Sequence, residues 1–119
     1  MWIHRIVGAA LMLTAAWPAP AQVAPAAVER GRKLAKEACA TCHAISGSGP
    51  SRMKDAPVFS TLLMTFPGRN LDEILARGLM SPHVTMPVFL ATSQNMDDLL
   101  AYLTTVQVKR MAGGQGATP

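Results

Sequence analysis

The sequence is poor in the residues that build several common kinds of site. Its 119 residues include only two cysteines, and His4 and His83 are badly placed to join them as ligands. A closed zinc site usually needs four Cys or His ligands, so a structural zinc site is disfavoured. A redox-active cysteine pair would need a strand-to-helix setting, and no segment shows a convincing strand pattern. A short-loop disulfide remains an alternative for the two cysteines.

Aromatic residues are scarce as well. Both tryptophans fall near the N-terminus, at positions 2 and 17, which leaves three phenylalanines and one tyrosine for the rest of the chain. These few rings make a thin core, and small domains often need a bound or covalent group to hold them together. The net charge is +4, but the basic residues lack the interleaved aromatics of a nucleic-acid-binding surface. No nucleic-acid partner is therefore expected.

The first 21 residues have the layout of a secretory signal peptide. A short basic segment at 1–5 precedes an uncharged apolar run at 6–16, and Ala19-Pro20-Ala21 gives an A-x-A cleavage pattern. The run is too short for a membrane span, which needs about 20 residues, and an uncleaved N-terminal anchor is the alternative. We therefore expect a signal peptide at 1–21, one domain at 22–110 and a flexible tail at 111–119. Export would place the domain in the periplasm.

One motif accounts for both cysteines. Cys39-Ala40-Thr41-Cys42-His43 has the C-x-x-C-H pattern that attaches a c-type haem. Each thiol can add across one haem vinyl group, and the two intervening residues hold both sulfurs along one edge of the porphyrin. The adjacent histidine then lies under the ring, where an imidazole nitrogen can bind the iron. The sequence therefore predicts one covalent haem c held by Cys39, Cys42 and His43.

Helical patterns dominate the rest of the chain, which is predicted to be all-α. The expected helices cover residues 27–40, 60–66, 70–79 and 92–106. In the first of them, apolar residues recur at spacings of three and four along one face, and the helix leads directly into the motif. Asn70 is a good N-cap with Glu73 at the capping-box position, and Thr92 can cap the last helix. Gly78 is a candidate C-terminal stop, and a flexible tail is expected from Gly113.

Met86-Pro87 is the second feature with chemical meaning. A thioether sulfur is a soft ligand that suits haem iron opposite a histidine. The proline that follows fixes its own φ and stiffens the loop, which helps to hold a weak ligand in place. Most of the eight methionines lie in settings typical of packing or of the N-terminal segment, whereas Met86 lies in an irregular stretch just before a helix. Met86 is therefore the predicted second axial ligand, with His83 a loop residue that could compete for the iron in a refolded state.

Together these features resemble a class I cytochrome c of the small bacterial type. The resemblance spans residues 28–106 and depends on the following matches in order: Gly31 eight positions before Cys39, the C-x-x-C-H motif, Gly49-Pro50, Ala56-Pro57-Val58-Phe59, Met86-Pro87 and Asp98-Leu99-Leu100-Ala101-Tyr102-Leu103. It implies three main helices and loops wrapped around one covalent haem, with the N- and C-terminal helices crossing. Two features depart from the family: Ala35 stands where an aromatic is common, and no tryptophan follows the signal segment to bond a haem propionate.

The resemblance also implies specific contacts. Gly31 should pack near Leu99 and Tyr102 where the two helices cross. The carbonyl of Pro50 should accept a hydrogen bond from His43 and orient its ring, because such contacts tune a metal ligand. His43 and Met86 should be the axial pair.

The expected function is single-electron transfer in the periplasm, with the iron cycling between Fe(III) and Fe(II). With both axial positions filled, no small-molecule substrate is expected to reach the iron, and the protein would not be an enzyme by itself. Its partners would be redox proteins such as a dehydrogenase, oxidase or reductase, and the chain is expected to be a monomer. The alternatives are a five-coordinate haem sensor or ligand-binding protein, and a dedicated haem subunit of a larger complex. A haem-free dithiol protein is the last alternative.

Overall fold

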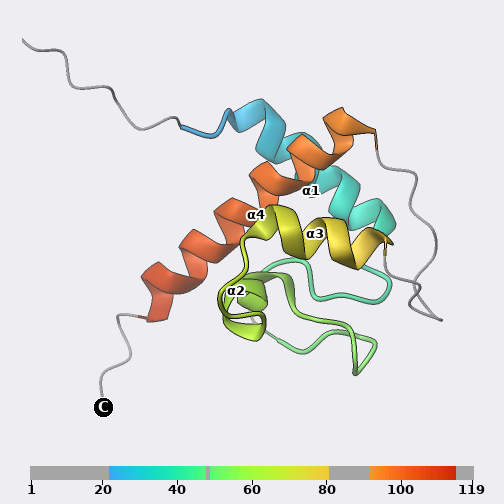
Figure 1. Ribbon diagram of the computed structural model, residues 1–119, viewed down its shortest axis with the longest axis vertical. Coiled ribbons are helices and arrows are strands. Elements are labelled where there is room, and N and C mark those ends of the chain that lie inside the picture. The colour runs from blue at the N-terminus through green and yellow to red at the C-terminus, as the bar shows by residue number, and fades with distance from the viewer. Residues whose placement is uncertain (1–21, 48, 81–91, 115–119) are drawn as a thin grey trace, which may run out of the picture.

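The computed structural model describes residues 22–47, 49–80 and 92–114 of the chain. Within these ranges the regular structure is entirely helical, which confirms the all-α class (Figure 1). The elements are α1 (Pro25–Ala38), the 3₁₀ turn η1 (Phe59–Thr61), α2 (Leu62–Thr65), α3 (Leu71–Met80) and α4 (Ser93–Gly114). None of the helices in these ranges is long and apolar enough to cross a membrane.

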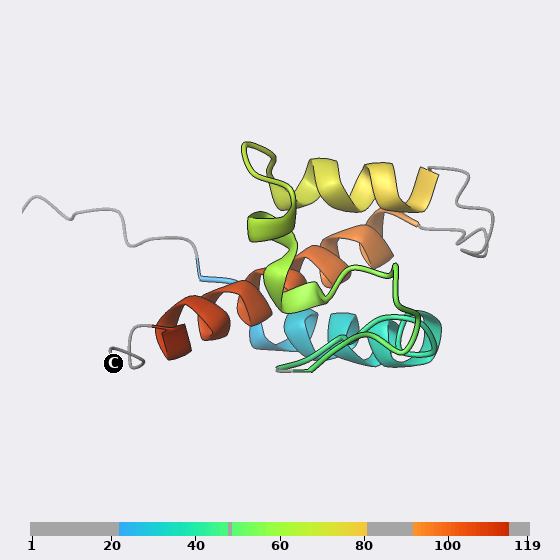
Figure 2. The same cartoon turned by 90° about the horizontal axis from the view of Figure 1, so that it is seen from below.

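Helix α4 is the central element. It contacts α1, α3 and η1, and Figure 2 shows α1 and α3 on opposite sides of it. The segment between α1 and η1 has no regular helix and loops around one end of the bundle (Figure 2). Loops packed against a small set of crossing helices are what the expected class I cytochrome c fold would show.

The crossing of α1 and α4 depends on Gly31, which is buried. A Cβ atom at this position would lie 1.8 Å from the backbone oxygen of Asp98 and 2.9 Å from the Cβ of Tyr102. Only a residue without a side chain lets the two backbones approach so closely. The predicted contact with Tyr102 is confirmed, while the nearest backbone atom belongs to Asp98 rather than to its neighbour Leu99.

An ion pair lies next to this crossing. The Nε and a terminal nitrogen of Arg30 each donate to one carboxylate oxygen of Asp98, both at 2.8 Å. Gln94, one turn earlier on α4, donates to the same carboxylate at 3.1 Å. The hydrogen bonds from Arg30 hold the pKa of the buried Asp98 carboxyl below its usual value. The bidentate geometry fixes the register of α1 on α4.

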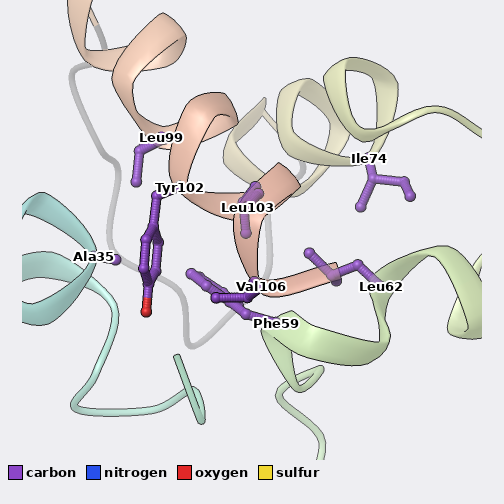
Figure 3. Packing of buried hydrophobic residues seen from close by; sticks show 8 residues of the cluster. All are labelled: Ala35, Phe59, Leu62, Ile74, Leu99, Tyr102, Leu103 and Val106. Carbon is purple, nitrogen blue, oxygen red and sulfur yellow. The ribbon is translucent and has the colours of Figure 1, made fainter. Parts of the chain in front are cut away.

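The apolar core gathers around the inner face of α4. Four of its buried members come from α4, and the others come from α1, η1, α2 and α3 (Figure 3): Ala35, Phe59, Leu62, Ile74, Leu99, Tyr102, Leu103 and Val106. Ala35, which replaces the aromatic common in the family, is completely buried and lies on the same side of the cluster as the ring of Tyr102. Within the described residues, the buried cluster contains two aromatic rings, those of Phe59 and Tyr102.

The helix ends follow the local signals in part. Asn70 and Thr92 cap α3 and α4 as predicted, accepting the backbone N–H of Glu73 at 2.8 Å and of Asn95 at 3.2 Å. Helix α3 continues through Gly78 to Met80, so that glycine is not the stop. Helix α4 continues past Val106 to Gly114, so the first four residues of the tail expected at 111–119 are helical.

Candidate haem site

The C-x-x-C-H motif forms a tight turn at the end of α1. The backbone N–H of Cys39 donates to the carbonyl of Ala35 at 2.9 Å, which completes the last turn of the helix. Cys42 and His43 in turn donate their N–H groups to the carbonyl of Cys39, at 3.1 and 2.9 Å. Residues three and four apart in such a turn lie on the same side, so both thiols and the imidazole are brought to one side of the chain.

Both cysteines are present as free, half-buried thiols, so the structure does not show the short-loop disulfide. Desolvation, with a smaller contribution from Cys42, raises the pKa of the Cys39 thiol to about 11. An unattached Cys39 thiol is therefore protonated at neutral pH. Among the described residues, no group of three or more Cys, His, Asp or Glu side chains is placed to hold a metal ion.

The ring of His43 is held by a backbone carbonyl. Its Nδ1–H donates to the carbonyl oxygen of Pro57 at 2.8 Å. A carbonyl can only accept, so this bond places the proton on Nδ1 and leaves the lone pair of Nε2 for a metal. The expectation that Pro50 supplies this carbonyl is wrong, because Pro50 is exposed and the chain returns to the histidine only at Pro57.

A further contact fixes the same ring. The ring of Phe59 lies against the imidazole, with centroids 5.2 Å apart and planes tilted by 46°. Phe59 is buried at the start of η1, so the segment 56–59 lies against the histidine. Its backbone supplies the hydrogen-bond acceptor, and its aromatic side chain supplies packing.

Backbone hydrogen bonds explain why this segment returns to the motif. Met53 donates its N–H to the carbonyl of Cys42, and Phe59 donates its N–H to the carbonyl of Ala44, both at 3.0 Å. The hydroxyl of Ser51 accepts the N–H of Ala44 at 3.0 Å. The motif and residues 51–59 are therefore joined on both sides of His43, and the imidazole lies between them.

Two side chains of α4 also reach this region, and no sequence pattern predicts a role for either polar group. The hydroxyl of Tyr102 donates to the carbonyl of Ile45 at 2.9 Å. The buried side chain of Gln107 bonds two backbone groups, the carbonyl of Phe59 and the N–H of Leu63. The available signal for Gln107 was its place four residues after Leu103, on the buried stripe of the helix, where a polar residue needs partners.

Met86 and His83 lie outside the described residues, so the second axial ligand stays a prediction. The donors that are described fit a covalent haem on chemical grounds. Two half-buried thiols precede an imidazole whose Nδ1 is already bonded, which leaves one nitrogen for iron. The set offers two groups for thioether bonds and one axial ligand, in the order the motif requires.

Comparisons with known proteins lead to the same family. Residues 28–107 match the sequence model of the family described as Cytochrome c. Over 80 residues the chain is 31% identical to cytochrome c-552 of Bradyrhizobium diazoefficiens, an alignment that covers 65% of this chain and 72% of that protein. No solved structure matches the chain significantly. The chain therefore belongs to the cytochrome c family, as a class I member with the covalent c-type haem and the electron-transport role that this family implies.

Proposed function

We propose that this protein is a periplasmic single-electron carrier in which Cys39 and Cys42 form the thioether bonds and His43 and Met86 are the axial ligands. The observation that carries the proposal is the 2.8 Å hydrogen bond from Nδ1 of His43 to the carbonyl of Pro57. It selects the tautomer with a free Nε2 and prevents the ring from rotating. A histidine held in this way is organised as a metal ligand before any metal binds.

When bound, the haem supplies an iron that can gain and lose one electron. The described residues supply its attachment and its surroundings. The end of α1 presents the two thiols, and the carbonyl of Pro57 orients the imidazole by accepting a hydrogen bond from its Nδ1–H. Phe59 packs against the imidazole and limits its contact with water. A fixed environment keeps the structural change between the two redox states small, which favours electron transfer over bond-making chemistry.

Met86 is proposed as the second axial ligand because of its sequence setting. It lies between the end of α3 at Met80 and the N-cap of α4 at Thr92, followed directly by Pro87. In the sequence, the segment that carries it joins two helices that contact each other. With His43 and Met86 both bound, no coordination position would remain for a substrate, which favours an electron carrier over an enzyme.

The periplasmic location is proposed from residues 1–21, whose pattern is that of a signal peptide. The partners are proposed to be redox proteins of that compartment. Three basic side chains near the motif, Lys36, Arg52 and Lys54, are exposed and suit transient docking with an acidic surface. Other basic residues of α1 are engaged within the chain, since Arg30 bonds Asp98 and Arg32 bonds Glu29.

The test is a pair of absorption spectra of the protein produced with a haem-attachment system. We expect a sharp α band when it is reduced, and, when it is oxidised, the weak red band that marks thioether-to-iron ligation. Met86→Ala should abolish the red band. The matched controls are Met53→Ala and Met64→Ala, which remove methionines with exposed side chains and should leave the band in place.

Four outcomes would contradict parts of the proposal. A high-spin reduced spectrum that shifts on adding carbon monoxide would mean an open iron site and favour the sensor. A red band that survives Met86→Ala would assign the ligand to another residue. Loss of the haem on acid–acetone extraction would overturn the covalent attachment to Cys39 and Cys42. Isolation of the native protein bound tightly to an oxidoreductase would replace the free carrier with a dedicated subunit.

A further inference from the structure

We infer that Gln107 is a positioning residue for the axial histidine, acting through the backbone of residues 59–63. The inference rests on the proposed role of His43 as an iron ligand. Gln107 lies late in α4, far from the motif in sequence, and it is one of the few buried polar residues in the described part of the chain, with 4% of its surface exposed. A buried amide needs partners, and here both partners belong to the segment that holds the histidine.

The side-chain amide of Gln107 joins α4 to η1 and α2. Its Nε2 donates to the carbonyl of Phe59, and its Oε1 accepts the backbone N–H of Leu63 at 3.3 Å. The assignment of nitrogen and oxygen is fixed by the partners, since the carbonyl can only accept and the N–H can only donate. One side chain thus holds the first residue of η1 and the second residue of α2 on the same surface of α4.

From Phe59 the coupling reaches His43 by three contacts. The ring of Phe59 packs on the imidazole with centroids 5.2 Å apart. The N–H of Phe59 donates to the carbonyl of Ala44, the residue after the histidine. Two residues before Phe59, the carbonyl of Pro57 accepts the Nδ1–H of the histidine at 2.8 Å. A displacement of Phe59 would therefore disturb the packing, the backbone and the hydrogen bond of the ligand together.

Tyr102 likewise holds the chain that follows the histidine by a hydrogen bond from α4. Its hydroxyl donates to the carbonyl of Ile45, two residues after His43, at 2.9 Å. Gln107 and Tyr102 thus fasten two separate segments next to the histidine to one helix. The distinguishing feature of Gln107 is that it holds the segment that carries the acceptor carbonyl, so its loss should loosen the Pro57 bond more than the loss of the tyrosine hydroxyl does.

The experiment measures hydrogen exchange of the His43 Nδ1–H in the reduced, haem-loaded protein by NMR. Gln107→Leu keeps much of the side-chain volume and removes both hydrogen bonds. We expect exchange about tenfold faster than in the unaltered protein, the size of effect that loss of a buried hydrogen bond produces. The control is Ile74→Ala, which removes buried volume from α3, and Figure 3 shows Ile74 apart from Phe59. The two variants are compared in conditions that give them equal global stability.

Gln107→Glu provides a second test that does not depend on the tolerance of the leucine variant. The introduced carboxylate can still accept from Leu63, but it can donate to the carbonyl of Phe59 only when it is protonated. The exchange rate of the histidine proton, divided by that of the unaltered protein at the same pH, should therefore rise as the carboxyl group ionises. If Gln107 contributed only to general stability, the exchange rate of the histidine proton would follow the rate of global unfolding at every pH.

Equal exchange rates in Gln107→Leu and Ile74→Ala at equal global stability would overturn the inference. So would a ratio of exchange rates, Gln107→Glu to the unaltered protein, that does not change with pH. Failure of the proposed function would be seen differently. If His43 does not bind the haem iron, its ring protons in the unaltered protein will lack the large displacement that the porphyrin ring current causes. That observation requires no variant, so the two failures can be told apart.

Discussion

Replacement of Gly31 by alanine should strongly destabilise the protein, although alanine is the better helix former. The added Cβ would lie 1.8 Å from the carbonyl oxygen of Asp98, 2.5 Å from its carbonyl carbon and 2.9 Å from the Cβ of Tyr102. The helices would have to separate by about 1.5 Å to restore ordinary contact, which begins at 3.4 Å. The nearest atoms are helix backbone, so no flexible side chain can move away to relieve the clash.

The expected magnitude follows from two opposing effects. Overpacking of this kind costs about 3 kcal/mol, near the upper end of its usual range, because separating the helices also disturbs the core on both sides. The higher helix propensity of alanine returns about 1 kcal/mol. Gly31→Ala should therefore lower the free energy of unfolding by about 2 kcal/mol, which is a large part of the stability of a small domain.

Gly78 offers a matched control, because the same substitution meets no such obstacle. It also lies inside a helix. Among the described residues, apart from its chain neighbours and the backbone of its own helix, no atom lies within 4 Å of the position of an added Cβ. Gly78→Ala should raise the free energy of unfolding by about 0.5 kcal/mol. Guanidinium unfolding of the two oxidised, haem-loaded variants measures both changes. A Gly31→Ala protein as stable as the original would show that the α1–α4 crossing is not as close as described.

Three further predictions concern other contacts. The hydrogen bonds from Arg30 lower the pKa of the Asp98 carboxyl in the folded state. The pair therefore stabilises the fold fully at pH values above the ordinary carboxyl pKa of 3.8, and this stabilisation is lost as the pH falls through the lower pKa of the folded state. Asp98→Asn should therefore reduce the thermal midpoint at neutral pH by more than at acidic pH; an equal reduction at both would contradict the assignment. Tyr102→Phe should cost roughly 1 kcal/mol in guanidinium unfolding, because it leaves a backbone carbonyl without its donor; no loss would mean that water replaces the hydroxyl. Cys39→Ser or Cys42→Ser should each leave a single thioether bond, visible as a shifted pyridine-haemochrome band, and the double variant should release its haem in acid–acetone.

The helices were largely predictable because their signals are local. Periodic apolar residues define α1, α3 and α4, and side-chain oxygens at positions 70 and 92 define two of the starts. The extra length of α4 was not predictable from the same rules. The glycines from Gly113 predict the start of a tail, yet the helix continues to Gly114 through Lys109, Arg110 and Met111, which are all good helix formers.

The acceptor for His43 illustrates a different limit. Both Pro50 and Pro57 follow a small residue within one loop, and local chemistry does not distinguish their carbonyls. The choice depends on the path of the loop, which is set by the backbone bonds from Met53 to Cys42 and from Phe59 to Ala44. These bonds join residues that are 11 and 15 positions apart, and no sequence rule specifies such pairings. The donors of the site were therefore predictable, whereas the group that orients the histidine was not.

The polar residues of α4 share a pattern that explains how a fold with few aromatics keeps its site in order. Asp98, Tyr102 and Gln107 follow one another at intervals of four and five residues, and each bonds a different segment. The first holds α1, which leads into the thiols; the second holds the chain after His43; the third holds the segment with the acceptor carbonyl. Hydrogen bonds are directional where apolar packing is not, so they specify the register of each segment as well as its proximity. The geometry of the axial histidine is thus determined from α4, an element that contributes none of the described donors of the site.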